Sequence, residues 1–255
     1  MRVAGEIPRA GEPVSQPFVP EIFDTIQGEG RNMGQPATFL RLSNCNLQCT
    51  WCDTPYTWNW EGTPYEHEDG DKYIRQDEQA NLDVETIVTE LLTHDIKRLV
   101  ISGGEPMIQQ KGIYELVGLL KTADPERQVE IETNGTIPPS AELAGLVDQF
   151  NVSPKLENSG NKKDKRDKPK AMETFVQLPN ADFKFVLGSP DDIEEVLELV
   201  DRYEIPANRV FLMPEGRTKE KIEEGQKDLV EFCEKYGFNL STRLHLILFG
   251  NKRGT

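Results

Sequence analysis

The chain has 255 residues, with 29 Lys and Arg against 44 Asp and Glu, so its formal net charge is −15. This length can bury one substantial core, and the acidic balance argues against a binder of nucleic acid or of membrane surfaces and favours small-molecule ligands in a local pocket. The N-terminus lacks an apolar secretion segment and no apolar run approaches the ~20 residues of a membrane span, so we expect a cytoplasmic protein.

The chain begins with residues 1–16, which are rich in glycine, proline and polar residues and are predicted to form a loose extension. From residue 17 onward, short apolar segments alternate with amphipathic ones, so residues 17–255 are expected to form a single domain. The expected strands cover 37–42, 98–102, 129–132, 150–153, 183–187, 209–213 and 243–248, and the expected helices begin after Asp83, near Ile113, at Ser189 and at Thr218.

This alternation of strands and helices is typical of an α/β fold with a parallel sheet and outer helices. With about six such units, we expect a partial (incomplete) TIM-type barrel rather than the closed eight-stranded form. Barrel sites gather at the carboxyl ends of the strands. The motifs described below all follow predicted strands, which supports this interpretation.

The lysine-rich segment 161–170 (NKKDKRDKPK) is mixed with aspartate and contains Pro169. We interpret it as a solvated loop. Contact with a protein partner, or closure over a site, is the alternative. Cys233 shares a predicted helical face with Leu229 and Val230 and is expected to be a buried small apolar residue.

Three cysteines form the most informative motif, C-x3-C-x2-C, at Cys45, Cys49 and Cys52. Three thiolates can hold a 4Fe–4S cluster and leave one iron without a protein ligand, whereas an electron-transfer cluster has four cysteine ligands. An open iron can bind S-adenosylmethionine, which the reduced cluster splits to start radical chemistry. The alternative is a zinc site of the Cys3His type, closed by His67 or His94.

A second motif, VISGGEP, ends a predicted strand at residues 100–106. Gly103 and Gly104 let the backbone approach a ligand closely. Glu105 offers a carboxylate to a cation such as an α-ammonium group. Taken alone, a Gly-Gly turn between a strand and a helix is equally well explained as a simple connection.

With these two motifs the chain resembles the radical S-adenosylmethionine superfamily. Over residues 20–250, an ordered series of short motifs resembles one family within it, the 7-carboxy-7-deazaguanine synthases. Trp51 stands before the last cysteine, as is typical of the superfamily. The series comprises FDTIQGEG (23–30), RLSNCNLQC, CDT (52–54), SGGEP, ETNGT (132–136), VSPK (152–155), FLMPEG (211–216) and RLH (243–245).

The resemblance implies a lyase that contracts the ring of 6-carboxy-5,6,7,8-tetrahydropterin to 7-carboxy-7-deazaguanine and releases ammonia, a step of 7-deazaguanine (queuosine-type) biosynthesis. It implies three cofactors: a 4Fe–4S cluster, S-adenosylmethionine and Mg²⁺. It also implies an electron donor such as flavodoxin or ferredoxin, and a homodimer. Whether the product enters transfer RNA, DNA or a secondary metabolite does not follow from the resemblance.

The resemblance also assigns roles to residues. Cys45, Cys49 and Cys52 would hold the cluster, and Thr54 would bind Mg²⁺, although Thr54 also fits a plain turn. Substrate contacts are expected from Ile26, Gln27, Gly28, Glu29, Arg41, Ser102 and His245. Cofactor contacts are expected from Trp51, Asp53, Gly104, Glu105, Asn134, Ser153, Pro154, Lys155, Met213, Pro214, Glu215 and Gly216.

Physical chemistry supports two of these substrate contacts directly. The Glu29 carboxylate suits the two adjacent donors of a guanidine-like edge, and the Arg41 guanidinium fits a carboxylate bidentately. His245 fits equally well as a buried histidine in an apolar strand.

The chain departs from the family pattern in the N-terminal extension, the polar insert at 65–79, the lysine-rich segment and the tail GNKRGT. Some relatives contact substrate through their C-terminal carboxylate, but Thr255 is not assigned that role. Three other functions remain open: a glycyl-radical activating enzyme, a zinc-stabilised binding module, and a related deazapurine enzyme with an altered substrate.

Overall fold

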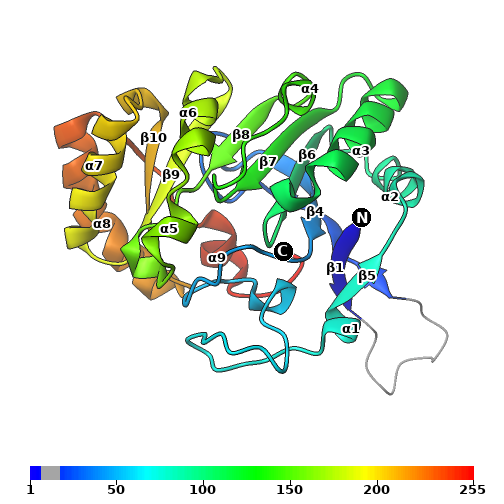
Figure 1. Cartoon of the computed structure of the whole chain (residues 1–255), viewed down its shortest axis with the longest axis horizontal. Coiled ribbons are helices and arrows are strands. Elements are labelled where there is room, and N and C mark those ends of the chain that lie inside the picture. The colour runs from blue at the N-terminus through cyan, green and yellow to red at the C-terminus, as the bar shows by residue number, and fades with distance from the viewer. Residues whose placement is uncertain (7–17) are drawn as a thin grey trace.

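The computed structural model describes residues 1–6 and 18–255 and shows an open, mostly parallel sheet with helices packed along its outer side (Figure 1). The parallel strands run in the order β11-β10-β9-β8-β7-β6-β4. Six of them form the main sheet and β11 adds two residues, which confirms the predicted partial barrel. The strands are β4 (Pro36–Leu42), β6 (Arg98–Gly103), β7 (Gln128–Thr133), β8 (Gln149–Val152), β9 (Ala181–Leu187), β10 (Val210–Pro214) and β11 (Asn239–Leu240).

An antiparallel extension continues the sheet beyond β4. There β3 (Ile22–Ile26) and β1 (Arg2–Glu6) both pair with β4, and β1 also pairs with β2 (Val19–Pro20) and β5 (Gln79–Asn81). The predicted loose extension is therefore wrong for residues 2–6. Val3 and Ala4 are fully buried there, and this burial fixes the strand in the sheet. Residues 7–17 lie outside the described residues, and the single domain over 17–255 stays a prediction.

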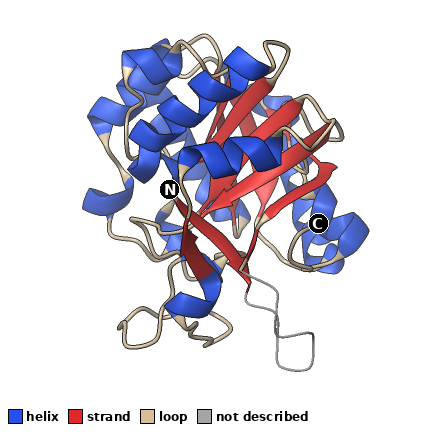
Figure 2. Cartoon of the chain, turned by 90° about the vertical axis from the view of Figure 1, so that its right-hand side faces the viewer, coloured by secondary structure: helices blue, strands red, loops and turns tan. Residues whose placement is uncertain are grey.

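Most of the helices cover the outer side of the sheet (Figure 2). None in the described part of the chain is long and apolar enough to cross a membrane. The α-helices are α1 (Arg75–Glu78), α2 (Val84–Leu91), α3 (Gln110–Ala123), α4 (Ala141–Ala144), α5 (Lys163–Arg166), α6 (Pro169–Gln177), α7 (Ile193–Arg202), α8 (Lys219–Tyr236) and α9 (Leu244–Phe249); the 3-10 helices are η1 (Pro55–Thr57), η2 (Pro106–Gln109), η3 (Glu157–Ser159), η4 (Pro190–Asp192) and η5 (Ala207–Arg209).

The predicted helix starts at Asp83, Ser189 and Thr218 are confirmed by their caps, whereas the helix expected near Ile113 begins at Gln110 without a side-chain cap. The Asp83 side chain accepts from the Thr86 amide at 2.7 Å, and Ser189 forms a capping box with Asp192. The core lies between the helices and the sheet. Phe150 of β8 is fully buried there and packs edge-on against Phe175 of α6, with ring centroids 5.5 Å apart. Burying each such side chain stabilises the fold by about 1.5–3 kcal/mol.

The last predicted strand, 243–248, is wrong: this segment forms helix α9. The alternating apolar pattern of RLHLIL suggested a strand, but tertiary contacts outweigh this local preference. The Leu244 amide donates to the Gly28 carbonyl at 2.9 Å, and the Arg243 side chain holds the helix start by donating to the Gly216 carbonyl at 2.7 Å. In Figure 1, α9 lies on the open side of the sheet, facing the cysteine segment.

The lysine-rich segment also differs from the prediction, because it forms α5 and the start of α6 instead of a loop. Pro169 occupies the first turn of α6, where a missing amide hydrogen costs nothing. Arg166 is buried and pairs with Glu195 at 2.5 Å. The lysines between 162 and 170 stay at the surface, except that Lys168 is partly covered.

Candidate active site

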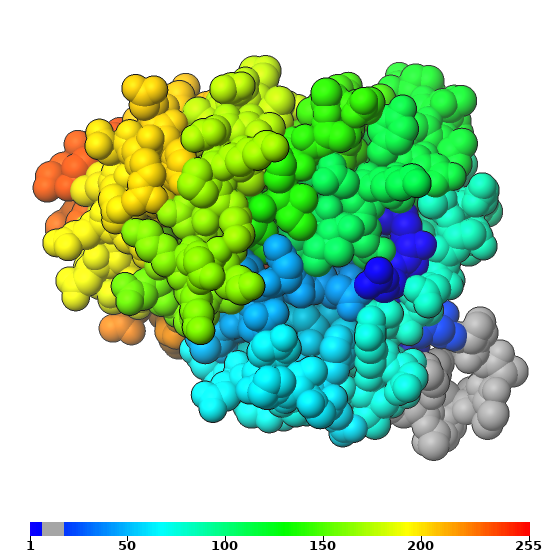
Figure 3. Space-filling view, viewed as in Figure 1, coloured from blue at the N-terminus to red at the C-terminus, as the bar shows by residue number. Residues whose placement is uncertain are grey.

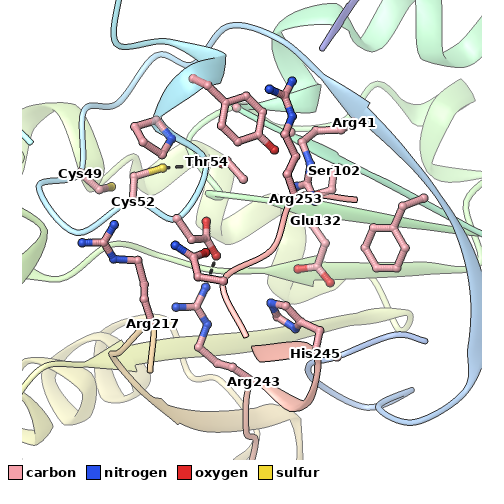
Figure 4. A pocket seen from close by; sticks show the side chains of 18 of the residues that line it. Arg41, Cys49, Cys52, Thr54, Ser102, Glu132, Arg217, Arg243, His245 and Arg253 are labelled. Carbon is pink, nitrogen blue, oxygen red and sulfur yellow. Dashed lines mark hydrogen bonds and ion pairs between the residues drawn. The ribbon is translucent and has the colours of Figure 1, made fainter. Parts of the chain in front are cut away.

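A cavity of about 800 Å³ lies at the carboxyl ends of the parallel strands, where barrel enzymes place their sites. Figure 4 shows side chains from distant parts of the chain pointing into it. Most of the predicted site residues line this cavity: Ile26, Gln27, Gly28, Glu29, Arg41, Cys45, Cys49, Trp51, Cys52, Asp53, Thr54, Ser102, Gly104, Asn134, Ser153, Lys155, Met213 and His245.

Glu105 does not line the cavity, in contrast to the prediction. Its carboxylate is 1% exposed and accepts hydrogen bonds from the Met107 amide (2.9 Å), the Thr133 hydroxyl (2.7 Å) and the Asn134 amide (2.6 Å). Burial raises the pKa of Glu105, and these donors oppose that shift. Oε1 accepts two of these bonds and Oε2 accepts the one from the turn after β7, so the carboxylate is buried behind the cavity wall and does not face a ligand in the cavity.

Four other predicted cofactor residues also lie outside the cavity lining. Glu215 forms an ion pair with Lys221, and the Gly216 carbonyl accepts from Arg243. Pro154 and Pro214 follow lining residues in the chain but do not line the cavity themselves. Cofactor contacts from these four residues therefore stay a prediction.

The three cysteines of the motif lie together at one end of the cavity, and no disulfide joins them. Burial raises the pKa of all three thiols, that of Cys49 to about 12. Thiols in such a setting ionise only when a cation compensates them, as cluster irons would. Each sulfur also accepts one N–H hydrogen bond. The donors are Leu47 N to Cys45 (3.5 Å), Asn161 Nδ2 to Cys49 (3.3 Å) and Trp58 Nε1 to Cys52 (3.3 Å).

The spacing of the sulfurs distinguishes a multi-iron cluster from a single zinc ion. Tetrahedral zinc with Zn–S bonds of about 2.3 Å needs sulfurs about 3.8 Å apart. Within the described residues, only the trio Glu29, Asp53 and His245 brings three ligand atoms within 4.8 Å of one another, so at least one pair of the three sulfurs is more than 4.8 Å apart. Separate irons of one cluster fit this wider spacing. The residues present therefore fit a 4Fe–4S cluster.

Neither histidine proposed for a zinc site is available as a ligand. Nε2 of His67 lies 2.7 Å from the Cys52 carbonyl oxygen, and its Nδ1 accepts from the Asp69 amide at 3.2 Å. His94 bonds Asp24 through Nδ1 at 2.8 Å and does not line the cavity that contains the cysteines. The polar insert thus supports the cysteine segment through His67 instead of closing a metal site.

The two glycines of the GGEP motif dock against the start of the cysteine segment. A Cβ atom on Gly103, whose φ is +136°, would lie 1.9 Å from the Leu42 carbonyl oxygen, and one on Gly104 would lie 2.2 Å from that of Asn44. The Gly104 and Glu105 amides donate to these same carbonyls at 3.1 and 2.8 Å. Only glycine permits this approach, which ties β6 to the cysteine segment.

A largely buried ionic network forms the opposite side of the cavity, with Lys184 buried and its two carboxylate partners partly exposed to the cavity. Lys184 on β9 pairs with Glu29 and, at 3.0 Å, with Glu132 on β7. Burial opposes ionisation of Glu29, but Lys184, Arg243 and His245 outweigh it and hold the pKa of Glu29 well below its usual range. Burial raises the pKa of Glu132, and Lys184 opposes that shift. Glu29 is therefore a carboxylate at neutral pH.

Arg243 links this network to the cysteine segment. It donates to Glu29 at 3.3 Å and forms an ion pair with Asp53, beside Cys52. Next to it, burial lowers the pKa of His245, so its imidazole is neutral at pH 7. The motif residues 243–245 therefore join the Glu29 side of the cavity to its cysteine side.

Arg41 presents a free guanidinium edge to the cavity. Its Nε donates to Glu21 at 2.7 Å, and within the described residues its two terminal nitrogens make no hydrogen bond. Glu21 also accepts from the Tyr56 hydroxyl (2.9 Å) and from Arg253 Nε (3.1 Å). Glu21 thus fixes the orientation of Arg41, whose terminal nitrogens can bind an oxyanion bidentately.

Lys155 and Thr54 lie near the cysteines. Lys155 Nζ donates to Ser153 Oγ at 2.9 Å and lies 5.5 Å from the centre of the Trp51 ring. The Thr54 hydroxyl lies 3.7 Å from Cys52 Sγ and lines the cavity. Hard oxygen groups suit Mg²⁺, so Thr54 and the adjacent Asp53 carboxylate could hold this ion.

Sequence reasoning assigned no role to several charged lining residues: Glu132, Lys184, Arg217, Arg243, Arg253 and the tail through Thr255. A signal for Lys184 did exist, because it is a lysine within the otherwise apolar segment FKFVL. Arg217, paired with Asp69 of the insert at 2.7 Å, and Arg253 gave no local signal.

Comparison with known proteins agrees with this geometry. Residues 41–229 match the Radical SAM superfamily. The chain is 37% identical over 236 residues to the 7-carboxy-7-deazaguanine synthase of Pyrobaculum aerophilum, covering 92% of this chain and 95% of that protein. The chain belongs to the 7-carboxy-7-deazaguanine synthase family. The enzyme of that name from Rhodopirellula baltica is 34% identical over 262 residues, covering 97% and 91%.

A solved structure supports the same assignment. The crystal structure of QueE from Escherichia coli superposes with a TM-score of 0.63 at 25% identity, covering 96% of this chain and 95% of that one. Membership in the superfamily implies a 4Fe–4S cluster and S-adenosylmethionine as cofactors. These findings favour neither the glycyl-radical activating enzyme nor the zinc-stabilised module.

Proposed function

We propose that this protein is a radical S-adenosylmethionine lyase that converts 6-carboxy-5,6,7,8-tetrahydropterin to 7-carboxy-7-deazaguanine with release of ammonia, in 7-deazaguanine biosynthesis. One observation carries the proposal. The three cysteines, the ionised Glu29 and the free edge of Arg41 line one cavity in a chain 37% identical to a named 7-carboxy-7-deazaguanine synthase.

The cysteine end of the cavity would hold the cofactors. Cys45, Cys49 and Cys52 would bind the cluster, and Gly104, Asn134, Ser153, Lys155 and Met213 would border S-adenosylmethionine. When bound, the cluster and S-adenosylmethionine supply a 5′-deoxyadenosyl radical. Lys155 and Trp51 line this end of the cavity. The N–H groups that donate to the sulfurs would fix the orientation of the cysteine side chains.

Glu29 would bind the hydrogen-bonding edge of the pterin. Each of its oxygens already accepts from one protein cation, Arg243 at Oε1 and Lys184 at Oε2. A carboxylate oxygen has two lone pairs, so each oxygen keeps one for the adjacent ring N–H and amino group of the substrate. The flanking cations keep Glu29 ionised and therefore purely an acceptor.

Arg41 would bind the substrate carboxylate through its two terminal nitrogens. Thr54 would hold Mg²⁺ together with substrate oxygens, with Asp53 as a neighbouring oxygen donor. The neutral imidazole of His245 can accept a hydrogen bond or a proton from the substrate at one ring nitrogen. Three further expectations stay predictions: a homodimer, a cytoplasmic location and a dedicated electron donor such as flavodoxin or ferredoxin.

Binding of 6-carboxytetrahydropterin, measured anaerobically by calorimetry on the cofactor-loaded enzyme, tests the substrate assignment. We expect Arg41→Met to weaken binding about 10- to 100-fold, because a charge-assisted hydrogen bond contributes about 1.5–3 kcal/mol. Arg31→Met is the matched control, since Arg31 pairs with Asp182 outside the cavity lining. Unchanged binding in Arg41→Met would show that this carboxylate site is misassigned.

A further inference from the structure

The segment 161–170 concentrates positive charge on an acidic protein. It carries six cationic and two anionic side chains, whereas the whole chain has a net charge of −15. Lys162, Lys165 and Lys170 are exposed, and within the described residues they form no ion pair. Several charges nearby are already neutralised by partners: Lys163 by Glu198, Arg166 by Glu195, and Asp167 by Arg202.

This cationic segment adjoins the cysteine segment directly. Asn161 Nδ2 lies 3.3 Å from Cys49 Sγ, and Asn161 Oδ1 accepts from the Gln48 amide at 2.9 Å. Trp51 Nε1 donates to the Asn158 carbonyl at 3.1 Å. In Figure 3, the lime surface that contains α5 borders the blue surface of the cysteine segment on one face of the molecule. Lys162 is thus one residue from a side chain that contacts a cluster ligand.

We propose that residues 161–170 are the docking surface for an acidic one-electron donor protein that reduces the cluster. The proposal rests on the proposed function, because that function requires a reduced cluster. One electron would leave the donor, which is oxidised by one electron, and enter the 4Fe–4S cluster, which is reduced by one. No covalent bond forms or breaks, and no other reactant is needed.

Electrostatics explains why docking would occur here. An acidic donor is repelled by a chain of net charge −15, so a complex forms where the local potential is positive. The unpaired lysines supply such a potential and would raise the association rate at low salt. Electron transfer falls steeply with distance, and Asn161 connects this surface by one hydrogen bond to Cys49. The same residues therefore place a donor close to the cluster.

The test compares Lys162→Glu/Lys165→Glu with the control Lys111→Glu/Lys227→Glu, whose exposed lysines lie on α3 and α8. Reduction of the reconstituted cluster by a fully reduced, strongly acidic flavodoxin is followed by anaerobic stopped-flow absorbance. We expect the second-order rate constant to fall at least 10-fold in the segment variant and to stay within 2-fold in the control. Added salt should slow the wild-type reaction more than that of the segment variant.

The milder variant Lys165→Ala/Lys170→Ala removes charge without reversing it, and its rate should lie between those of the wild type and of the charge-reversed variant. An unchanged rate in both segment variants, or an equal loss in the control, would overturn the docking proposal. Turnover with dithionite should be the same in all variants. If the wild type with dithionite leaves the pterin unchanged, the proposed function is wrong. The rates of cluster reduction would still test the docking surface in that case.

Discussion

The backbone of Gly28 lies directly against the imidazole of His245: a Cβ atom at position 28 would come within 2.1 Å of His245 Nδ1. The Leu244 amide also donates to the Gly28 carbonyl at 2.9 Å. The turn that carries Glu29 and the helix that carries His245 therefore form one unit. The close contact with His245, and not the backbone conformation, requires glycine at position 28, because the φ angle of Gly28 is not positive.

We predict that Gly28→Ala lowers kcat/KM about 10- to 100-fold, because the added methyl group displaces His245 from the cavity. The measurement is steady-state turnover of the reconstituted enzyme. Gly118→Ala is the matched control: it lies within α3 with no atom within 4 Å of the added Cβ, so turnover should not change. Equal turnover in Gly28→Ala and wild type would contradict the assigned contact.

Lys184 is the shared counter-ion of Glu29 and Glu132, so Lys184→Met leaves the partly buried Glu132 carboxylate without a cation and leaves Glu29 with Arg243 alone. We predict a loss of about 3–5 kcal/mol in the free energy of unfolding, measured by urea denaturation. The double variant Lys184→Met/Glu132→Gln should be more stable than the single variant, since one unpaired charge is removed with the cation. A strictly additive result would show that the two residues do not interact.

The pH dependence of stability should report the burial of His245. Its pKa in the folded protein lies below the unfolded value of about 6.5. As the pH falls through 6.5, the unfolded state binds a proton that the folded state resists, so the free energy of unfolding decreases, by up to about 1.4 kcal/mol per pH unit. Urea denaturation between pH 7.5 and 5.5 should show a smaller decrease in His245→Gln. Parallel curves for both proteins would contradict this prediction.

Arg253 fastens the C-terminal tail over the cavity. It donates to the Gly5 carbonyl at 2.8 Å, pairs with Glu78 at 2.6 Å and lies 3.8 Å from the centre of the Tyr56 ring. We predict that Arg253→Ala increases amide hydrogen exchange over residues 251–255 and in β1, whereas Lys252→Ala, which removes an exposed neighbouring cation, does not. Unchanged exchange in Arg253→Ala would show that the tail is held by other contacts.

Short-range patterns in the sequence were sufficient to predict the main sheet and to single out the three cysteines that line one end of the cavity. The C-x3-C-x2-C spacing lies within eight residues, and each strand from β4 to β10 is a short segment that contains buried apolar residues. Both patterns depend only on residues that are close in the sequence, so they can be recognised without knowledge of the tertiary structure.

What the sequence did not reveal depends on contacts between distant residues. β1 reads as part of a Gly- and Pro-rich extension, yet Val3 pairs with Leu42 in the sheet. The segment 243–248 alternates like a strand, but Arg243 and the Gly28 carbonyl fix it as a helix. Glu105 stands in a cofactor motif, while two of its three donors, Thr133 and Asn134, are residues that only folding brings near.

The most direct test of the central claim is an anaerobic turnover assay of the reconstituted protein with S-adenosylmethionine, dithionite, Mg²⁺ and 6-carboxytetrahydropterin, analysed by mass spectrometry. The proposed function predicts 7-carboxy-7-deazaguanine in the wild type and none in Cys45→Ala. Cleavage of S-adenosylmethionine by the wild type, with the pterin left unchanged, would contradict it.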